Sequence, residues 1–214
     1  MILAIYCAGG LGMQTLELAW AINRWEKIIF VDDVTEEKFV SGVPVYRFDE
    51  LEQFGNNVEF VIANGEPAYR KMLFDKIESS KYPFTNIISP WTPVLTGTKI
   101  GKGCIIFDAG ISVSVEIGDN VFIDSKAIIG HHTSVKSHCV ISAMVFAGGH
   151  TEISEQVYVA PGAMLKDRIK IGESAIISMG AVVLRSVKAL AIMVGNPAKK
   201  IGENTERKVF SLFG

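Results

Sequence analysis

The sequence predicts a small parallel α/β domain followed by a parallel β-helix. Within residues 1–85, short apolar runs alternate with helical patterns, and the runs stop at glycine turns or an acidic pair. From residue 117 onward apolar residues recur every six positions, a period that fits neither a helix nor an alternating strand. We therefore divide the chain into an α/β domain of residues 1–85, a β-helix of residues 86–197 and a C-terminal tail of residues 198–214.

Three apolar runs in the first domain have the length and composition of buried strands. They cover residues 2–6, 28–31 and 59–63. Residues with helical spacing follow the first run and the third: Leu16, Ala19, Trp20, Asn23, Tyr69, Met72, Leu73 and Ile77. This order of strands and helices predicts a parallel sheet with crossover helices.

The strand ends of this domain carry candidate substrate-binding residues, because ligands of open parallel sheets bind beyond the carboxyl ends of the strands. The candidates are Gly9, Gly10, Asp32, Asp33 and Gly65. The glycine turn, with an acid about twenty residues later, also matches a dinucleotide site. However, 85 residues are too few for both halves of an NAD-binding domain.

The second half carries a hexapeptide repeat. Every sixth residue is apolar in the series Ile117, Ile123, Ile129, Val135, Ile141, Ala147, Ile153, Val159, Leu165, Ile171, Ile177 and Val183. Four positions later the residues are mostly small or β-branched, from Val121 to Val187. This repeat is typical of a β-helix with three short faces per coil, in which the aliphatic residue points inward and the smaller one turns the corner. An earlier turn at Ile100, Ile106 and Ile111 is out of phase by one residue.

About five coils follow from this repeat, and a solenoid of coils needs covers at both ends. We expect the α/β domain to cover one end and the tail from Ala198 to Phe213 to cover the other. The flat faces and strand edges of such a solenoid also favour self-association.

All four histidines lie in the β-helix, at His131, His132, His138 and His150. His132 and His150 are one coil apart, so they should stack with a spacing of about 4.8 Å on one edge. One histidine could act as a general base, or several could bind a metal. Zinc needs three protein ligands; the repeat stacks two histidines in one subunit, so a third would have to come from a neighbour. We therefore expect no metal.

Composition points to a soluble cytoplasmic protein. The charge balance of 21 basic and 23 acidic residues gives no support to nucleic-acid binding. We expect no membrane span, because no apolar run approaches the ~20 residues that a span requires, and no signal peptide, because the N-terminus lacks a basic region. Three widely spaced cysteines fit a reducing compartment and contain no metal-ligand pair.

The whole chain resembles the bacterial sugar O-/N-acetyltransferases of the left-handed β-helix, hexapeptide-repeat class, which include nucleotide-amino-sugar N-acetyltransferases and sialic acid O-acetyltransferases. These pair a small Rossmann-like domain with a β-helix. The resemblance rests on residues 8–10, 30–33 and 62–65 with Arg70, and on residues 117–121, 129–131 and 195–199.

The resemblance implies an acetyl-CoA-dependent homotrimer whose small-molecule acceptor is a nucleotide-linked amino sugar destined for a surface glycan. A histidine at the position of His131 would be the general base, and the reaction would need no metal. Relatives usually carry an acid after this histidine, whereas this chain has His132, which leaves open a second histidine in proton transfer. Cys7 and Leu11 also depart from the usual glycine turn, so the N-terminal pocket could hold a different sugar.

The resemblance also implies a set of contacts with acetyl-CoA. These residues are His138, Val140, Gly149, Pro161, Met179, Gly180 and Lys199. Val140 lies where relatives often have a histidine near the acetyl group, and this chain instead carries His138. The amide of Gly148 or Gly149 is a candidate oxyanion donor. Lys199 and Lys200 could meet the phosphates of coenzyme A.

Three alternatives remain at this stage. The first is O-acetylation of a sugar such as sialic acid, within the same class. The second is a metal enzyme of the γ-carbonic-anhydrase kind, whose histidine pair five residues apart is absent here. The third is a catalytically silent member of the family, which the altered glycine turn and His132 would fit.

Overall fold

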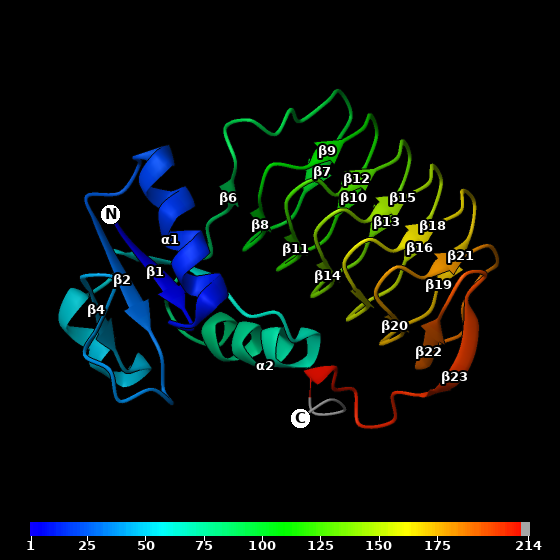
Figure 1. The fold of residues 1–214 in the computed structure, drawn as a ribbon. Helices are drawn as coiled ribbons and strands as arrows, with labels where there is room; N and C mark the ends of the chain where they lie inside the picture. The colour runs from blue at the N-terminus through cyan, green and yellow to red at the C-terminus, as the bar shows by residue number, and fades with distance from the viewer. Residues whose placement is uncertain (211–214) are drawn as a thin grey trace.

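A computed structural model describes residues 1–210 of the chain. Figure 1 shows an α/β domain in blue and cyan beside a β-helix whose coils run from green to orange. The tail, in red, returns from the last coils toward helix α2. Among the described residues, no helix combines the length and the hydropathy needed to cross a membrane.

The α/β domain is built on a five-stranded sheet with the order β3-β4-β2-β1-β5. Its strands are β1 (Ile2–Tyr6), β2 (Lys27–Val31), β3 (Phe39–Val40), β4 (Val43–Tyr46) and β5 (Val58–Ile62). β1 pairs in parallel with β2 and β5, and all its side chains are buried, which explains its uninterrupted apolar sequence. Helix α1 (Gly10–Ile22) packs on one face of the sheet and α2 (Pro67–Glu78) on the other, so the predicted strands and helices are confirmed.

The edge of this sheet is not predicted by the apolar pattern. It consists of the short hairpin β3–β4, which turns at Ser41 and Gly42, both with positive φ, and is followed by the 3-10 helix η1 (Phe48–Phe54). Strands of this length are too short to show a period. Trp20 and Met72 share the helical spacing of the predicted helices, but they are 46% and 51% exposed because each lies beside the buried stripe of its helix.

The β-helix has three faces of short parallel strands, each strand pairing with its counterpart one coil away. The charged face contains β7 (Lys99–Ile100), β10 (Glu116–Ile117), β13 (Ser134–Val135), β16 (Glu152–Ile153) and β19 (Lys170–Ile171). The covered face contains β6 (Ile87–Ile88), β8 (Ile105–Ile106), β11 (Phe122–Ile123), β14 (Val140–Ile141), β17 (Tyr158–Val159), β20 (Ile176–Ile177) and β22 (Ala191–Val194). The apolar face contains β9 (Gly110–Ile111), β12 (Ile128–Ile129), β15 (Phe146–Ala147), β18 (Met164–Leu165) and β21 (Val182–Val183).

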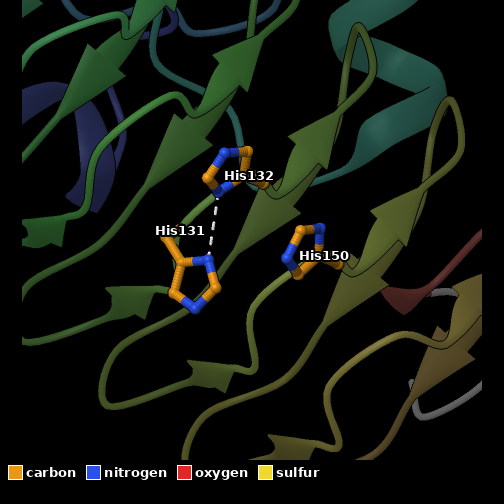
Figure 2. Close-up of side chains that lie close together, drawn as sticks. All are labelled: His131, His132 and His150. Atoms are coloured by element: carbon orange, nitrogen blue, oxygen red, sulfur yellow. Dashed lines mark hydrogen bonds between the residues drawn. The ribbon is translucent and has the colours of Figure 1, made fainter.

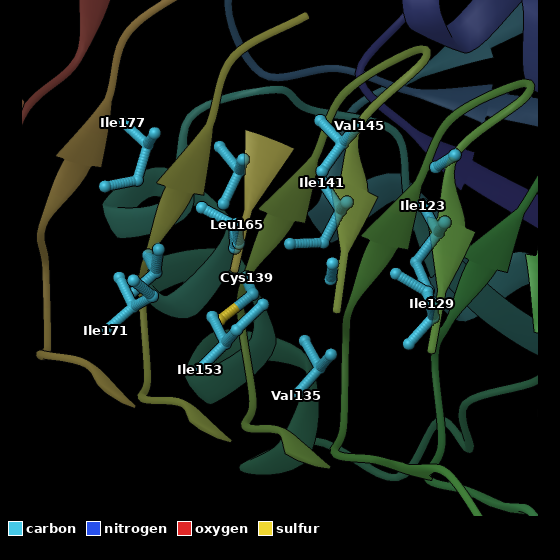
Figure 3. Packing of buried hydrophobic residues seen from close by; sticks show 14 of the residues in the cluster. Ile123, Ile129, Val135, Cys139, Ile141, Val145, Ile153, Leu165, Ile171 and Ile177 are labelled. Atoms are coloured by element: carbon cyan, nitrogen blue, oxygen red, sulfur yellow. The ribbon is translucent and has the colours of Figure 1, made fainter. Parts of the chain in front are cut away.

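The hexapeptide series forms the core of this domain. All twelve residues from Ile117 to Val183 are buried in one cluster. Figure 3 shows side chains of this cluster, among them Ile123, Ile141 and Ile177, packed inside the prism. β7 to β21 make five coils, as the repeat predicts. The first coil is one residue short, because Ile117 pairs with Ile100 while Ile129 pairs with Ile111. That is the phase shift seen in the sequence.

The α/β domain does not simply cover an end of the solenoid, as we expected. It packs along the covered face, where Phe122 and Val140 belong to the same buried cluster as Leu16 of α1. The outward residues Ile87, Ile105, Phe122 and Val140 are apolar because the α/β domain removes them from water. The hexapeptide period specifies inward positions, and it holds no information about which outward face receives another domain.

The tail covers the last coil only in part. β23 (Lys199–Glu203) pairs antiparallel with β22, and the chain then turns back toward the α/β domain. There Glu66 accepts the backbone N–H groups of Val209, at 2.8 Å, and Phe210, at 3.1 Å, through its Oε2 atom. Phe213, which we expected to help cover the end, lies outside the described residues.

Candidate active site

Three histidines meet at one edge of the β-helix, the histidine corner, where the apolar face turns into the charged face. His131 and His132 lie between β12 and β13, and His150 lies between β15 and β16. His132 and His150 have left-handed backbones, with φ of 59° and 58°. Ser114 and Arg168 have the same conformation at the same corner of the adjacent coils. The corner geometry therefore stacks equivalent side chains from successive coils.

The rings of His132 and His150 are stacked, with centroids 4.8 Å apart and planes inclined by 14° (Figure 2). This confirms the predicted spacing of one strand. The ring of His131 stands perpendicular to both, with its centroid 5.3 Å from His132 and 5.1 Å from His150. One donor atom from each of the three histidines lies within 4.8 Å of the others. The expectation that one subunit supplies only two converging histidines was therefore wrong, because the turn brings His131 back beside the stacked pair.

His131 and His132 are joined by a hydrogen bond between their Nδ1 atoms, 3.1 Å apart (Figure 2). One Nδ1 must carry the proton and the other must accept it, so the two tautomers are linked. If Nδ1 of His131 is the donor, its Nε2 atom carries a free lone pair, as a general base requires. Both side chains are exposed.

Gly149 supports the ring of His131. A Cβ atom on Gly149 would lie 2.8 Å from His131 Nε2 and 2.9 Å from its Cε1, so only glycine allows this position of the ring. The amide of Gly148 donates to the carbonyl of Leu165 at 2.9 Å within the coil. Gly148 is therefore excluded as an oxyanion donor, and Gly149 is the remaining candidate of the two.

His138 and Val140 lie away from the histidine corner. His138 is 7% exposed, and its ring packs edge-on against Phe74 of α2 at 5.1 Å. Its Nδ1 atom is 3.1 Å from Nδ2 of Asn120. Burial, together with the nearby cations Lys71 and Arg70, lowers the pKa of His138 to about 4. Val140 is 2% exposed beneath the α/β domain, so neither side chain offers coenzyme A an open edge in this subunit.

The predicted acetyl-CoA contacts Pro161, Met179 and Gly180 lie at a different edge, the Pro161 corner, where the covered face turns into the apolar face. Pro161 and Met179 line an apolar groove of about 390 Å³ together with Tyr158, Val194 and Phe210. Gly180 has a φ of 65° and donates its N–H to Pro161 O. The width of the apolar face separates this corner from His131.

Lys199 begins β23 and lines a groove of about 390 Å³ with Arg185 and Pro197. Lys200, its neighbour in the strand, is ion-paired with Glu203 at 2.5 Å. Of the two lysines, only Lys199 lines this groove, so Lys199 is the better candidate to bind a phosphate there.

At the strand ends of the α/β domain, the glycines and acids have different surroundings. Gly9 and Gly10 are exposed at the start of α1, and a Cβ atom on either would meet nothing within 4 Å. The start of a helix with open space is a favourable place for a phosphate. Gly65 lies beneath the ring of Phe210. A Cβ atom built on Gly65 would be 3.6 Å from that ring.

The carboxylates of the acidic pair, Asp32 and Asp33, accept hydrogen bonds from other groups of the protein. Asp32 accepts backbone N–H groups from Ala8, at 2.9 Å, and Val34, at 2.9 Å. Asp33 accepts from Lys76 Nζ at 2.7 Å and from the Tyr6 hydroxyl. Partial burial would raise the pKa of Asp33, but these hydrogen bonds keep it below its usual value. Asp32 therefore orders the turn that follows β2, and Asp33 connects this turn to β1 and α2.

Arg70 joins the two domains and has a larger structural role than the sequence showed. It is fully buried, and its five N–H donors bond to carbonyls of Ile62, Asn64 and Asn120 and to the side chain of Asn120. Asn120 Nδ2 donates in return to Arg70 O at 3.0 Å. The resemblance pointed to Arg70, but no sequence signal indicated its partner.

Comparisons with known proteins agree with this architecture. Residues 2–77 match the family model described as the PglD N-terminal domain. PerB from Caulobacter crescentus, solved with CoA and GDP-perosamine, superimposes with a TM-score of 0.88 at 24% identity, covering 94% of this chain and 98% of that one. WeeI from Acinetobacter baumannii AYE gives a TM-score of 0.87 at 24% identity, covering 94% of this chain and all (100%) of that one. No curated protein matches the sequence.

More distant structures share the same architecture. The acetyltransferase domain of PglB from Neisseria gonorrhoeae FA1090, in complex with acetyl coenzyme A, has a TM-score of 0.67 at 22% identity, covering 94% of this chain and 98% of that one. The chain thus has the fold of the bacterial sugar acetyltransferases of the hexapeptide-repeat type, with a left-handed β-helix. The fold class that the sequence and its resemblance predicted is confirmed.

Proposed function

We propose that this chain transfers the acetyl group of acetyl-CoA to the amino group of a nucleotide-linked sugar, in the synthesis of a surface glycan, with His131 as the general base. The observation that carries the proposal is the placement of His131. Its ring lies over Gly149 with Nδ1 bonded to His132, in a chain whose fold matches PerB bound to CoA and GDP-perosamine.

The chemistry requires one base and no covalent enzyme intermediate. Nε2 of His131 accepts a proton from the sugar amine as the amine nitrogen attacks the thioester carbon of acetyl-CoA. The C–S bond then breaks, and the imidazolium returns the proton to the departing thiolate of coenzyme A. The former carbonyl oxygen of the acetyl group carries a negative charge in the tetrahedral intermediate. The amide N–H of Gly149 is the candidate hydrogen-bond donor to this oxygen. The products are an acetamido sugar and free coenzyme A.

The apolar face supports assembly into a homotrimer. Ile128, Phe146 and Met164 point outward from this face and are 41–50% exposed. The charged face instead carries ion pairs such as Lys170–Glu152, at 2.8 Å, and the covered face is already packed. An exposed apolar strip of this kind marks an interface. We propose that three chains bury these faces around a threefold axis.

A trimer of this kind would also complete the active site. In one chain the apolar face separates the histidine corner from the Pro161 corner. Around a threefold axis, a heterologous contact places the histidine corner of one chain beside the Pro161 corner of the next. Pro161, Met179 and Gly180 of one chain would then hold acetyl-CoA next to His131 of the other, with Lys199 nearer the phosphates.

We propose that residues 1–85 hold the nucleotide part of the acceptor. Gly9 and Gly10 leave the N-terminus of α1 open, where backbone N–H groups favour a phosphate. The acids Asp32 and Asp33 would act indirectly, by ordering the neighbouring turn. We also propose a cytoplasmic location, because all three cysteines are free, as in reducing compartments.

The test is a transfer assay with purified protein, acetyl-CoA and UDP-, dTDP- and GDP-linked 4-amino sugars, with free sialic acid as an O-acetylation acceptor. Mass spectrometry detects the acetylated product. We expect one amino sugar to be acetylated and the His131→Asn variant to be slower by about 10²–10⁴-fold. Ser114→Asn, at the same corner one coil before His132, is the matched control and should keep the wild-type rate. Equal rates for His131→Asn and wild type would overturn the assignment of the base, and failure to bind coenzyme A would overturn the function.

A further inference from the structure

We propose that His131, His132 and His150 form a binding site for a divalent transition metal ion, with Zn²⁺ as the best fit. The three imidazoles come from two consecutive coils of a single chain, and one donor nitrogen from each lies within 4.8 Å of the others. Imidazole nitrogen is a good ligand for zinc, copper and nickel. The site is thus complete without a partner subunit.

The spacing of the first two donors already approaches that of zinc ligands. Zn–N bonds of about 2.0–2.1 Å in a tetrahedral site place ligand nitrogens about 3.3 Å apart. The Nδ1 atoms of His131 and His132 are 3.1 Å apart. These two atoms now share one proton in a hydrogen bond. A metal ion between them would take the place of this proton and bind the lone pair of each Nδ1 atom.

The third donor needs only a side-chain rotation. The rings of His132 and His150 are stacked face to face, so their lone pairs now run side by side, and one ring must turn for them to converge. His131 and His132 are exposed and His150 is partly exposed, so this rotation meets no packed core. The backbones of His132 and His150 are fixed by the coil, through hydrogen bonds from their N–H groups to Val113 and His131. Three protein ligands would leave the fourth position of zinc open to water.

The site would act as an off switch for the proposed transfer reaction, and this consequence rests on the proposed function. A metal on Nδ1 of His131 leaves the proton of the neutral ring on Nε2. Nε2 then has no lone pair with which to accept the proton of the amine. Zinc would therefore inhibit transfer without competing directly for the acetyl-CoA groove at the Pro161 corner.

The binding test does not depend on activity. Chelator-treated protein is titrated with ZnCl₂ by calorimetry, and with Co²⁺ followed by its visible absorption, which is intense in tetrahedral sites. We expect one Zn²⁺ per chain, and at least about tenfold weaker binding in His132→Asn and in His150→Asn. Asparagine tolerates the left-handed backbone at both positions, so these variants should fold. Ser114→Asn, which has the same backbone at the same corner, should bind zinc like the wild type.

The outcomes separate the two proposals. Equal zinc affinity for wild type, His132→Asn and His150→Asn, or no binding at all, would overturn the metal site whatever the enzyme does. If zinc binds but the protein acetylates nothing, the metal site stands and the proposed function fails. If both hold, half-inhibition of His150→Asn should need at least about tenfold more zinc than that of the wild type; equal zinc sensitivity would overturn the off switch.

Discussion

The Nδ1 atom of His132 lies 3.1 Å from the Nδ1 atom of His131 and is the only hydrogen-bonding partner of that ring among the described residues. The second histidine thus contacts His131 at the position where the resemblance led us to expect an acid. In the proposed reaction, His132 can orient His131 by accepting its proton, but a neutral imidazole would stabilise the imidazolium of His131 less than a carboxylate would.

Replacing His132 with glutamate should therefore increase kcat, by up to about tenfold, because a carboxylate stabilises the positive charge that develops on His131. His132→Asn has a shorter side chain that withdraws from Nδ1, and its kcat should fall with little change in KM for acetyl-CoA. Steady-state kinetics on both variants provide the measurement. Identical kcat values for the glutamate and asparagine variants would show that His132 does not position the base.

Gly149→Ala should displace His131. The added Cβ would lie 2.8 Å from Nε2, closer than such contacts occur, so the ring must move off its position. We expect kcat to fall by about 10²-fold, the cost of misplacing a catalytic group by about 1 Å, while the melting temperature stays close to that of the wild type. Gly202→Ala is the control, because its Cβ would make an ordinary contact of 3.7 Å with Ile192. A normal rate in Gly149→Ala would show that the ring position does not limit catalysis.

The apolar face provides a test of assembly. Phe146 is 41% exposed at its centre, and Phe146→Glu would place a charge in each of three buried contacts of the proposed trimer. We expect a monomer by light scattering and no transfer, because the Pro161 corner of a neighbour is lost. Glu152 lies in the next strand, β16, which belongs to the charged face. The Glu152→Gln variant should therefore remain trimeric. A trimeric, active Phe146→Glu protein would place the interface on another face.

The core of the β-helix could be predicted residue by residue, because each inward position is fixed by the repeat alone. Cys139, for example, occupies the inward corner position, where the sequence predicts a small packing residue, and it is fully buried. The surroundings of the corners could not be predicted in this way. His132 and His138 hold the same position in successive hexads, yet His132 is exposed while helix α2 covers His138.

The site was predictable to the extent that it is local in sequence. The stacking of His132 on His150 follows from one coil of the repeat, whereas the return of His131 beside them depends on the conformation of the turn. Likewise, the acids after β2 were visible as strand-end residues, but Lys76, the partner of Asp33, lies in α2, far along the chain. Contacts between elements of different period leave no pattern in a single sequence.

Arg70 should be a principal link between the domains. Arg70→Met keeps much of the side-chain volume but leaves the buried carbonyls of Ile62 and Asn120 without their charged donor. We expect a loss of about 3–5 kcal/mol in the free energy of unfolding, measured by chemical denaturation. Lys71→Met, which removes an exposed ion pair with Asp75, should cost under about 1 kcal/mol. Similar losses in both variants would contradict the role of Arg70.

The burial of His138 predicts a pH-dependent stability. Its pKa is about 4 in the folded protein because burial disfavours the charged ring, against about 6.5 in the unfolded chain. Between these values the unfolded state binds the extra proton, so stability falls as the pH drops from about 6.5 toward 4. The full loss would be on the order of 3 kcal/mol.

Denaturant unfolding at pH 7 and pH 4.5 measures this loss in the wild type and in His138→Asn. Asparagine fits the left-handed backbone at this position, where φ is 63°. The variant should be less stable at pH 7, because a cavity replaces the contact with Phe74, but its stability should change less with pH. Over this range Asp33, whose pKa is lowered, remains ionised in the folded protein and contributes little to the difference. The same pH dependence in both proteins would mean that the buried imidazole is not the titrating group.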